Sequence, residues 1–134
     1  MKTIIAHGID LVDCHRIELL LERHGEHFTK RVYTEAELAQ APQGKRRSER
    51  LSGRFAAKEA IMKLIGTGWR DGVAWTDMEV VNDTQGCPQV NLYGKVKEIV
   101  IAQGIGQLSI SITHTANLAI ASVVALVDHE DTIL

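Results

Sequence analysis

The chain has 134 residues, the length of one ordinary domain, and can bury a hydrophobic core without disulfides or a structural metal. Hydrophobic residues make up 45% of it and charged residues 24%, which is typical of a globular protein and not of a disordered or membrane-embedded one. The formal net charge of −2 argues against broad nucleic-acid binding. No apolar run is long enough to span a bilayer and the N-terminus does not resemble a signal peptide, so we expect a cytoplasmic protein.

The N-terminal segment is predicted to lead into a site. Residues 3–12 mix β-branched side chains with Gly8 and end in acids, which predicts a strand, and a glycine there lets another backbone approach closely. Residues 13–23 then carry apolar side chains at helical spacing, with Asp13 as a plausible N-cap.

Two further helices are predicted in the first half of the chain. Thr34 and Glu37 form a capping-box pattern, so a short helix should follow and end before Pro42. Residues 50–65 form the strongest helical pattern and end at Gly66, where a left-handed C-cap is expected. This helix is apolar on two sides, which indicates a central position.

The second half favours hairpins. Residues 78–81 and 89–93 predict two strands joined by a turn, and residues 94–103 predict a shorter helix. Residues 108–115 alternate between apolar and polar, while residues 119–127 are almost wholly apolar, as in a strand buried on both faces. We therefore expect an α+β fold with a mostly antiparallel sheet packed against a long central helix, in a single domain over residues 1–134.

The predicted central helix carries four charges that require partners. Arg54 and Lys58 lie four residues apart, as do Glu59 and Lys63, and two exposed i,i+4 pairs are the simpler explanation. Alternatively, Asp10 at the end of the first strand converges with Glu59 to hold Mg²⁺, which needs only one or two protein carboxylates. Spacing alone does not decide between these interpretations.

Other polar motifs are less specific. Residues 45–50 are basic and could bind phosphates or an acidic protein, or form a solvated loop. Residues 66–68 lack a P-loop ending and are interpreted as a cap and turn. His114 at a strand end could contact substrate or shuttle a proton, although a histidine bonded to backbone is the commoner outcome. The remaining site candidates are interpreted as surface histidines and free thiols: His15, His24, His27, Cys14 and Cys87.

Four segments together carry a family resemblance across nearly the whole chain. They are Gly8-Ile9-Asp10-Leu11-Val12, Arg54-Phe55-Ala56-Ala57-Lys58-Glu59-Ala60, Gly66-Thr67-Gly68 and Ser111-Ile112-Thr113-His114-Thr115. In order and spacing they closely resemble the holo-acyl-carrier-protein synthases, the short branch of the 4′-phosphopantetheinyl transferases. The stretch from Arg54 to Ala60 is the most specific of the four.

The resemblance implies a 4′-phosphopantetheinyl transferase fold and Mg²⁺-dependent transfer of 4′-phosphopantetheine from coenzyme A to a serine of apo-acyl carrier protein, releasing adenosine 3′,5′-bisphosphate, as in fatty acid biosynthesis. Asp10 and Glu59 would ligate the metal, and Lys63 would act in catalysis. The phosphate contacts would come from Arg54, Lys58 and Lys63, with Gly66 and His114 also at the coenzyme A site, His114 near the 3′-phosphate or the nucleotide. The resemblance further implies a homotrimer with sites between subunits and a carrier contact through Arg16.

Departures and alternatives stay open. Ala6-His7 replaces the usual Gly-Ile before Gly8, which leaves the shape of the neighbouring pocket in question, and Cys87 stands where the family often has lysine. The carrier partner, the tolerance for acylated coenzyme A and the group that takes the serine proton are not determined. The alternatives are a non-catalytic coenzyme A-binding module and a nucleic-acid-binding domain using residues 45–50, the latter opposed by few aromatics and a negative charge.

Overall fold

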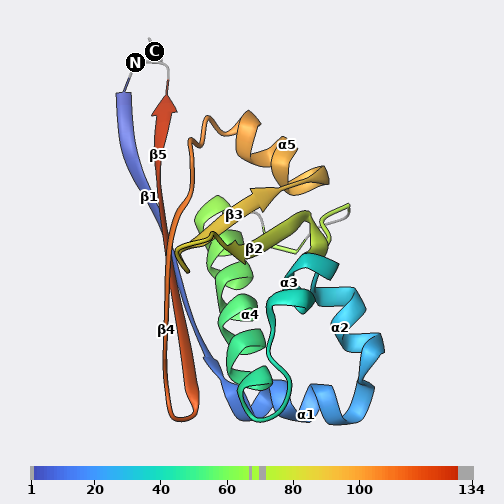
Figure 1. Cartoon of the computed structure of the whole chain (residues 1–134). Coiled ribbons are helices and arrows are strands. Elements are labelled where there is room, and N and C mark those ends of the chain that lie inside the picture. Colours follow the sequence, from blue (N-terminus) through green and yellow to red (C-terminus); the bar gives the residue numbers. More distant parts are fainter. Residues whose placement is uncertain (1, 67, 70–71, 130–134) are drawn as a thin grey trace.

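A three-stranded antiparallel sheet and a long helix organise the fold (Figure 1). The structure is a computed structural model and describes residues 2–66, 68–69 and 72–129. The sheet has the order β1-β5-β4, with both neighbouring pairs antiparallel. Its strands are β1 (Lys2–Asp13), β4 (Ser109–Thr115) and β5 (Leu118–His129). The expected α+β class with an antiparallel sheet is confirmed.

Helix α4 (Arg46–Ile65) lies against one face of this sheet and between the sheet and most of the remaining elements. On its other side lie the hairpin of β2 (Met78–Asn82) and β3 (Pro88–Leu92), which pair antiparallel, together with α2 (Glu26–Val32) and α3 (Glu35–Gln40). Helix α4 is therefore buried on both sides, as its two apolar faces predicted. The other elements are α1 (Cys14–His24), a 3₁₀ turn (Trp75–Asp77) and α5 (Gly94–Ala102).

Local capping chemistry confirms the predicted helix starts. The Asp13 side chain accepts from the His15 amide at 2.9 Å and caps α1. Thr34 and Glu37 form the complete capping box of α3, in which each side chain accepts from the other residue's amide. Because these capping hydrogen bonds involve only neighbouring residues, they can be predicted from the sequence without knowledge of the tertiary structure.

Two boundaries differ from the prediction. Helix α2 was not expected, because within its seven residues the buried apolar pair Phe28 and Val32 is the only sign of helical periodicity. Helix α4 begins at Arg46 and not at Arg50, so most of the basic run 45–50 forms its first turns. No side chain caps this start, and the sequence accordingly carries no capping signal there.

Strand β5 is buried on one face only, which corrects the expected doubly buried strand. Ala121, Val123 and Ala125 pack under α4, whereas Val124 and Leu126 point to the opposite face and are 39% and 60% exposed. That outer face of the sheet carries further apolar side chains from β1 and β5: Ile5, Ile9, Leu11 and Leu118. A monomer thus leaves a broad apolar surface in water.

Within the described part of the chain, no helix combines the length and apolar character that a membrane crossing requires. Both cysteines are free, Cys14 buried and Cys87 exposed, as expected.

Candidate active site

The site begins with a backbone contact between β1 and α4. A Cβ placed on Gly8 would lie 1.9 Å from the Ala60 carbonyl oxygen and 3.0 Å from the Leu64 amide nitrogen. Only glycine permits this approach. Asp10 follows on the same face of β1, and Glu59 and Lys63 flank Ala60 on α4. The close contact therefore brings the three side chains to one place.

Lys63 links the two elements directly. Its Nζ donates to the Asp10 carboxylate at 3.0 Å and to the Ile9 carbonyl oxygen at 3.1 Å. The Asp10 side chain is only 17% exposed, whereas that of Lys63 is 57% exposed. The amine is thus held at the site while part of it faces solvent, where a bound phosphate could reach it.

The Glu59 carboxylate lies in the same electrostatic environment. Burial, the largest cause, raises the pKa of this carboxyl above its ordinary value of 4.5, and repulsion from Asp10 raises it further. A hydrogen bond from Trp69 and the charges of Arg16 and Lys63 oppose this rise. The Asp10 and Glu59 carboxylates are partly buried and repel each other, and a cation bound between them would remove this repulsion.

The donor set fits Mg²⁺ better than a softer metal. Asp10 and Glu59 supply hard carboxylate oxygens, and Mg²⁺ fills its other positions with water and substrate phosphate. Among the described residues there is no group of three or more histidine, cysteine, aspartate or glutamate side chains that could hold a metal ion. A closed protein cage of the structural zinc type is therefore not formed by this part of the chain.

Lys58 does not lie with these residues. Its side chain is fully buried, and its Nζ donates at 2.6 Å both to Glu37 and to the Val32 carbonyl oxygen. Glu37 in turn accepts from the Val80 amide at 2.8 Å, so the ion pair joins α4 to α2, α3 and β2. Since the amine is enclosed by these partners, the expected phosphate contact of Lys58 is not carried into the proposed site.

Arg54 is also directed inward. It is 5% exposed and donates to the Asn82 side chain at 2.8 Å. Burial, the largest cause, and repulsion from Arg50 together lower the pKa of its guanidinium to about 10, and the charge of Glu37 opposes both. The two exposed i,i+4 pairs considered from the sequence are therefore wrong, because Arg54, Lys58 and Lys63 each bind partners outside α4.

Arg16 on α1 approaches Glu59 from the other side. Its guanidinium lies 5.5 Å from the centre of the Phe55 ring, and its charge acts on the Glu59 carboxylate. The Phe55 ring stacks on Trp75 at 4.7 Å, and Trp75 contacts Trp69 at 3.9 Å. Neither tryptophan stood out in the sequence, because the loop that carries Trp69 has no periodic pattern.

His114 lies at a different hollow, where β4 crosses α4. Its Nε2 would be 3.5 Å from a Cβ placed on Gly53, an ordinary contact distance, so the imidazole lies directly against this part of α4. The exposed ring lines a cavity of about 340 Å³ together with residues from α3, from α4 and from the loop between them: Gln40, Pro42, Arg46, Glu49 and Arg50. Two arginines and a histidine make this cavity suitable for an anion.

Gly66 ends α4 as predicted. It has φ +73°, and its amide donates to the Met62 carbonyl oxygen at 3.0 Å. Gly68 also has a positive φ, of +66°, while Thr67 lies outside the described residues. The structure establishes the cap and does not test the expected coenzyme A contact of Gly66.

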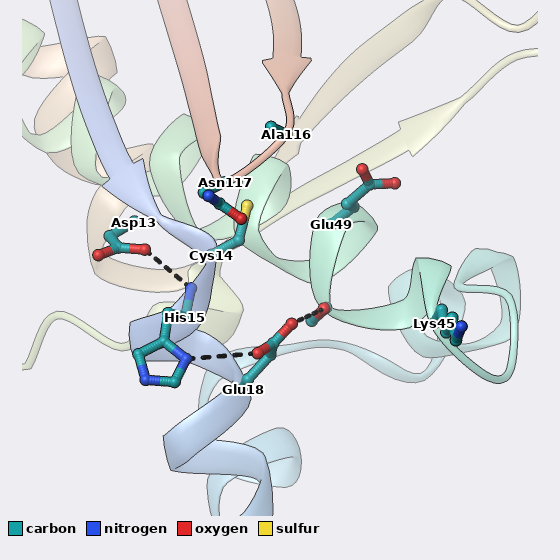
Figure 2. A pocket seen from close by; sticks show the side chains of 9 residues that line it. Asp13, Cys14, His15, Glu18, Lys45, Glu49, Ala116 and Asn117 are labelled. Atoms are coloured by element: carbon teal, nitrogen blue, oxygen red, sulfur yellow. Dashed lines mark hydrogen bonds and ion pairs between the residues drawn. The ribbon is translucent and has the colours of Figure 1, made fainter.

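A further cavity, of about 420 Å³, lies at the start of α1 beside the β4–β5 turn (Figure 2). Glu18 accepts from Ser48 at 3.2 Å, which joins α1 to α4, and it lies 3.5 Å from His15 within α1. The lining contains three acids, Asp13, Glu18 and Glu49, against the single Lys45. This balance opposes binding of a diphosphate, and Asp10, Glu59 and Lys63 do not line the cavity.

Comparison with known proteins identifies the family. The family model of the 4′-phosphopantetheinyl transferase superfamily matches residues 6–121. A holo-[acyl-carrier-protein] synthase of Solibacter usitatus is 45% identical over 121 residues, covering 90% of this chain and 97% of the relative.

Solved structures agree with this match. A holo-[acyl-carrier-protein] synthase of Helicobacter pylori in complex with coenzyme A is similar with a TM-score of 0.78 and 32% identity, over 89% of this chain and 98% of the other. A Bacillus anthracis holo-(acyl-carrier-protein) synthase in complex with coenzyme A (3′,5′-ADP) has a TM-score of 0.76 and 34% identity, over 95% and 100%. The chain belongs to the 4′-phosphopantetheinyl transferase superfamily and is an enzyme of its holo-[acyl-carrier-protein] synthase branch.

Proposed function

We propose that the chain transfers the 4′-phosphopantetheine group of coenzyme A to a serine of apo-acyl carrier protein with the help of Mg²⁺ and releases adenosine 3′,5′-bisphosphate. The observation that carries the proposal is the Gly8–Ala60 contact, because it brings Asp10, Glu59 and Lys63 from distant parts of the chain to one place. The coenzyme A and 3′,5′-ADP named for two similar structures are consistent with this substrate.

In the proposed reaction, the serine hydroxyl loses its proton to water and its oxygen forms a bond to phosphorus, the phosphoanhydride bond breaks, and the nucleotide leaves with the bonding electrons. Mg²⁺, when bound, would neutralise charge on the diphosphate. Asp10 and Glu59 would hold the ion, and Lys63 would contact phosphate oxygens from its solvent-facing side. Because the nucleophile belongs to the carrier protein, the chain needs only to orient groups and to stabilise charge.

The nucleotide end of coenzyme A would occupy the cavity beside His114. Arg46 and Arg50 line this cavity with the imidazole, and they offer the donors that a phosphate monoester requires. The basic run of the sequence would thus bind phosphate from the first turns of a helix and not from a solvated loop.

The outer sheet face supports the proposal of a homotrimer. Ile5, Leu11 and Leu126 are between 57% and 73% exposed there, and such a surface is typical of an interface between subunits. Carrier protein would dock at α1, where the exposed Arg16 lies next to Glu59 and so next to the proposed metal. Fatty acid biosynthesis is the expected context.

The test combines purified chain, coenzyme A, Mg²⁺ and an apo-acyl carrier protein. Mass spectrometry should show the carrier gaining the phosphopantetheine mass, with 3′,5′-ADP released. Asp10→Asn and Glu59→Gln should abolish transfer while their circular dichroism stays that of the wild type. Asp83→Asn, in the β2–β3 turn, is the matched control and should transfer normally. Binding of coenzyme A without any mass gain would instead identify a non-catalytic binding module.

A further inference from the structure

Four side chains form a continuous column beside Glu59. The Arg16 guanidinium covers one face of Phe55, the Phe55 ring stacks on Trp75, and Trp75 contacts Trp69 at 3.9 Å. These side chains come from α1, from α4, from the 3₁₀ turn and from the loop after α4. The column contains both tryptophans of the chain.

The geometry of α4 explains why the column runs past Glu59. Phe55 and Glu59 are four residues apart and lie one turn above each other on the same strip of the helix. Both ends of the column lie near the Glu59 carboxylate and lower its pKa, Trp69 as a side-chain hydrogen-bond donor and Arg16 through its charge. The column therefore encloses the carboxylate from two sides, while Lys63 and Asp10 lie on the β1 side.

Burial alone does not account for Trp69, which remains 40% exposed. The half of its ring that is covered packs on Trp75, and its only side-chain donor is the indole N–H. A glutamate has three side-chain torsions and loses substantial rotamer freedom when it is fixed. Because stacking on Trp75 holds Trp69 in place, its N–H orients the Glu59 carboxylate before any ligand binds.

We propose that Trp69 is a positioning residue for Glu59, holding its carboxylate toward Asp10 so that the two can share one Mg²⁺ ion. This inference rests on the proposed function, because it assumes that Glu59 ligates the metal. Arg16 and Trp69 act together, since the aromatic column fixes the distance between them. The consequence is that the indole N–H controls how much Mg²⁺ the enzyme requires, without touching coenzyme A or the carrier serine.

The test replaces the donor and keeps the ring. Trp69→Phe still packs on Trp75 but has no N–H, and Trp75→Phe is the matched control because Trp75 is not among the described groups that act on the Glu59 carboxylate. Each variant keeps one tryptophan beside the site. Its fluorescence therefore reports coenzyme A binding as Mg²⁺ is titrated, independently of turnover.

Trp69→Phe should need about tenfold more Mg²⁺ for half-maximal coenzyme A binding, as expected for a lost hydrogen bond to a charged group. Its melting temperature and its kcat at saturating Mg²⁺ should change little. Trp75→Phe should keep the Mg²⁺ midpoint within about twofold of the wild type. If Trp69→Phe does not fold, Trp69→Met provides a second donor-free side chain that still packs on an aromatic ring.

An unchanged Mg²⁺ midpoint in Trp69→Phe would overturn the inference, and so would equal shifts in both variants, because packing would then explain them. Wild-type transfer separates this failure from that of the proposed function. If the wild-type chain modifies the carrier in a Mg²⁺-dependent way, a negative result concerns Trp69 alone. If the wild-type chain shows no transfer at any Mg²⁺ concentration, both ideas are wrong.

Discussion

Substitution of Gly8 by alanine tests whether the contact between β1 and α4 builds the site. The added Cβ would lie 1.9 Å from the Ala60 carbonyl oxygen, and an ordinary contact requires at least 3.4 Å. The two backbones must therefore separate by about 1.5 Å. Since both neighbours are main chain, no side chain can rotate to relieve the overlap.

Two effects of Gly8→Ala follow from this displacement. Overpacking of this severity should lower the free energy of unfolding by about 3 kcal/mol, which for a chain of this length lowers the melting temperature by about 10 °C. The same shift moves Glu59 and Lys63 away from Asp10. A misplacement on the order of 1 Å can reduce catalysis by about a hundredfold, and excess Mg²⁺ should not restore the rate.

Differential scanning calorimetry and the carrier-modification assay measure the two effects separately. Gly106→Ala is the matched control, because its φ is not positive and its added Cβ would lie 3.3 Å from the nearest atom, the Leu126 carbonyl oxygen. This control should melt within a few degrees of the wild type and keep its activity. A Gly8→Ala variant that behaves like the control would refute the argument that the close approach positions the site.

Further expectations concern the ion pair, the hairpin and the sheet. Lys58→Met leaves Glu37 charged and unpaired in the interior and should cost about 3 kcal/mol of unfolding free energy, measured by urea denaturation. The hydrogen bond from Thr34 to Glu79 is 2.6 Å long and is the main cause that holds the pKa of Glu79 below its ordinary value of 4.5. The charged carboxylate therefore stabilises the fold above pH 4.5, and this contribution is lost as the pH falls further. Glu79→Gln should therefore melt lower than the wild type at pH 7, and the difference should shrink below pH 4.5; a constant difference would contradict this. Leu126→Glu should convert a trimer to monomers in light scattering, and a monomeric wild type would contradict the proposed assembly.

Those parts of the fold that depend on neighbouring residues could be predicted from the sequence. The cap at Asp13, the capping box at Thr34 and the glycine end at Gly66 each require only a few adjacent side chains. The strand pattern of residues 108–115 is legible for the same reason, since one face packs and the other is wet. The sequence placed these elements and their type correctly, whereas it missed α2 and the first turn of α4, neither of which begins with a side-chain cap.

The exposure of β5 could not be predicted, because it depends on which layers the fold builds. The composition of residues 119–127 is that of a strand covered on both sides, yet α4 covers only one face. A second layer is absent within the described chain, and exposed Leu126 and Val124 are the result. If three subunits assemble through this face, the composition of β5 describes the trimer and not the monomer.

The candidate site shows the same limit. In the sequence, α1, α2, α3 and most of α4 lie between Asp10 and Glu59, and no spacing rule connects the two acids. Gly8 predicted only that another backbone would approach β1 closely. The partner of that contact, Ala60, is known only from the fold. Trp69 gave no signal at all, because a tryptophan in a loop is equally consistent with packing, and only its stacking on Trp75 places it beside Glu59.

The charges of α4 show how one helix serves two purposes. Arg54 and Lys58 form one strip and Glu59 and Lys63 form another, and because successive residues turn by 100°, the strips face different neighbours. Glu37 provides an interior carboxylate for Lys58 and Asn82 an acceptor for Arg54, so both charges of the first strip have partners within the protein. The second strip meets Asp10 at an open edge, where Lys63 pairs with this acid. Among the described residues Glu59 forms no ion pair closer than 4.0 Å, so its carboxylate can bind a ligand, and this asymmetry separates the structural strip from the one proposed to act in catalysis.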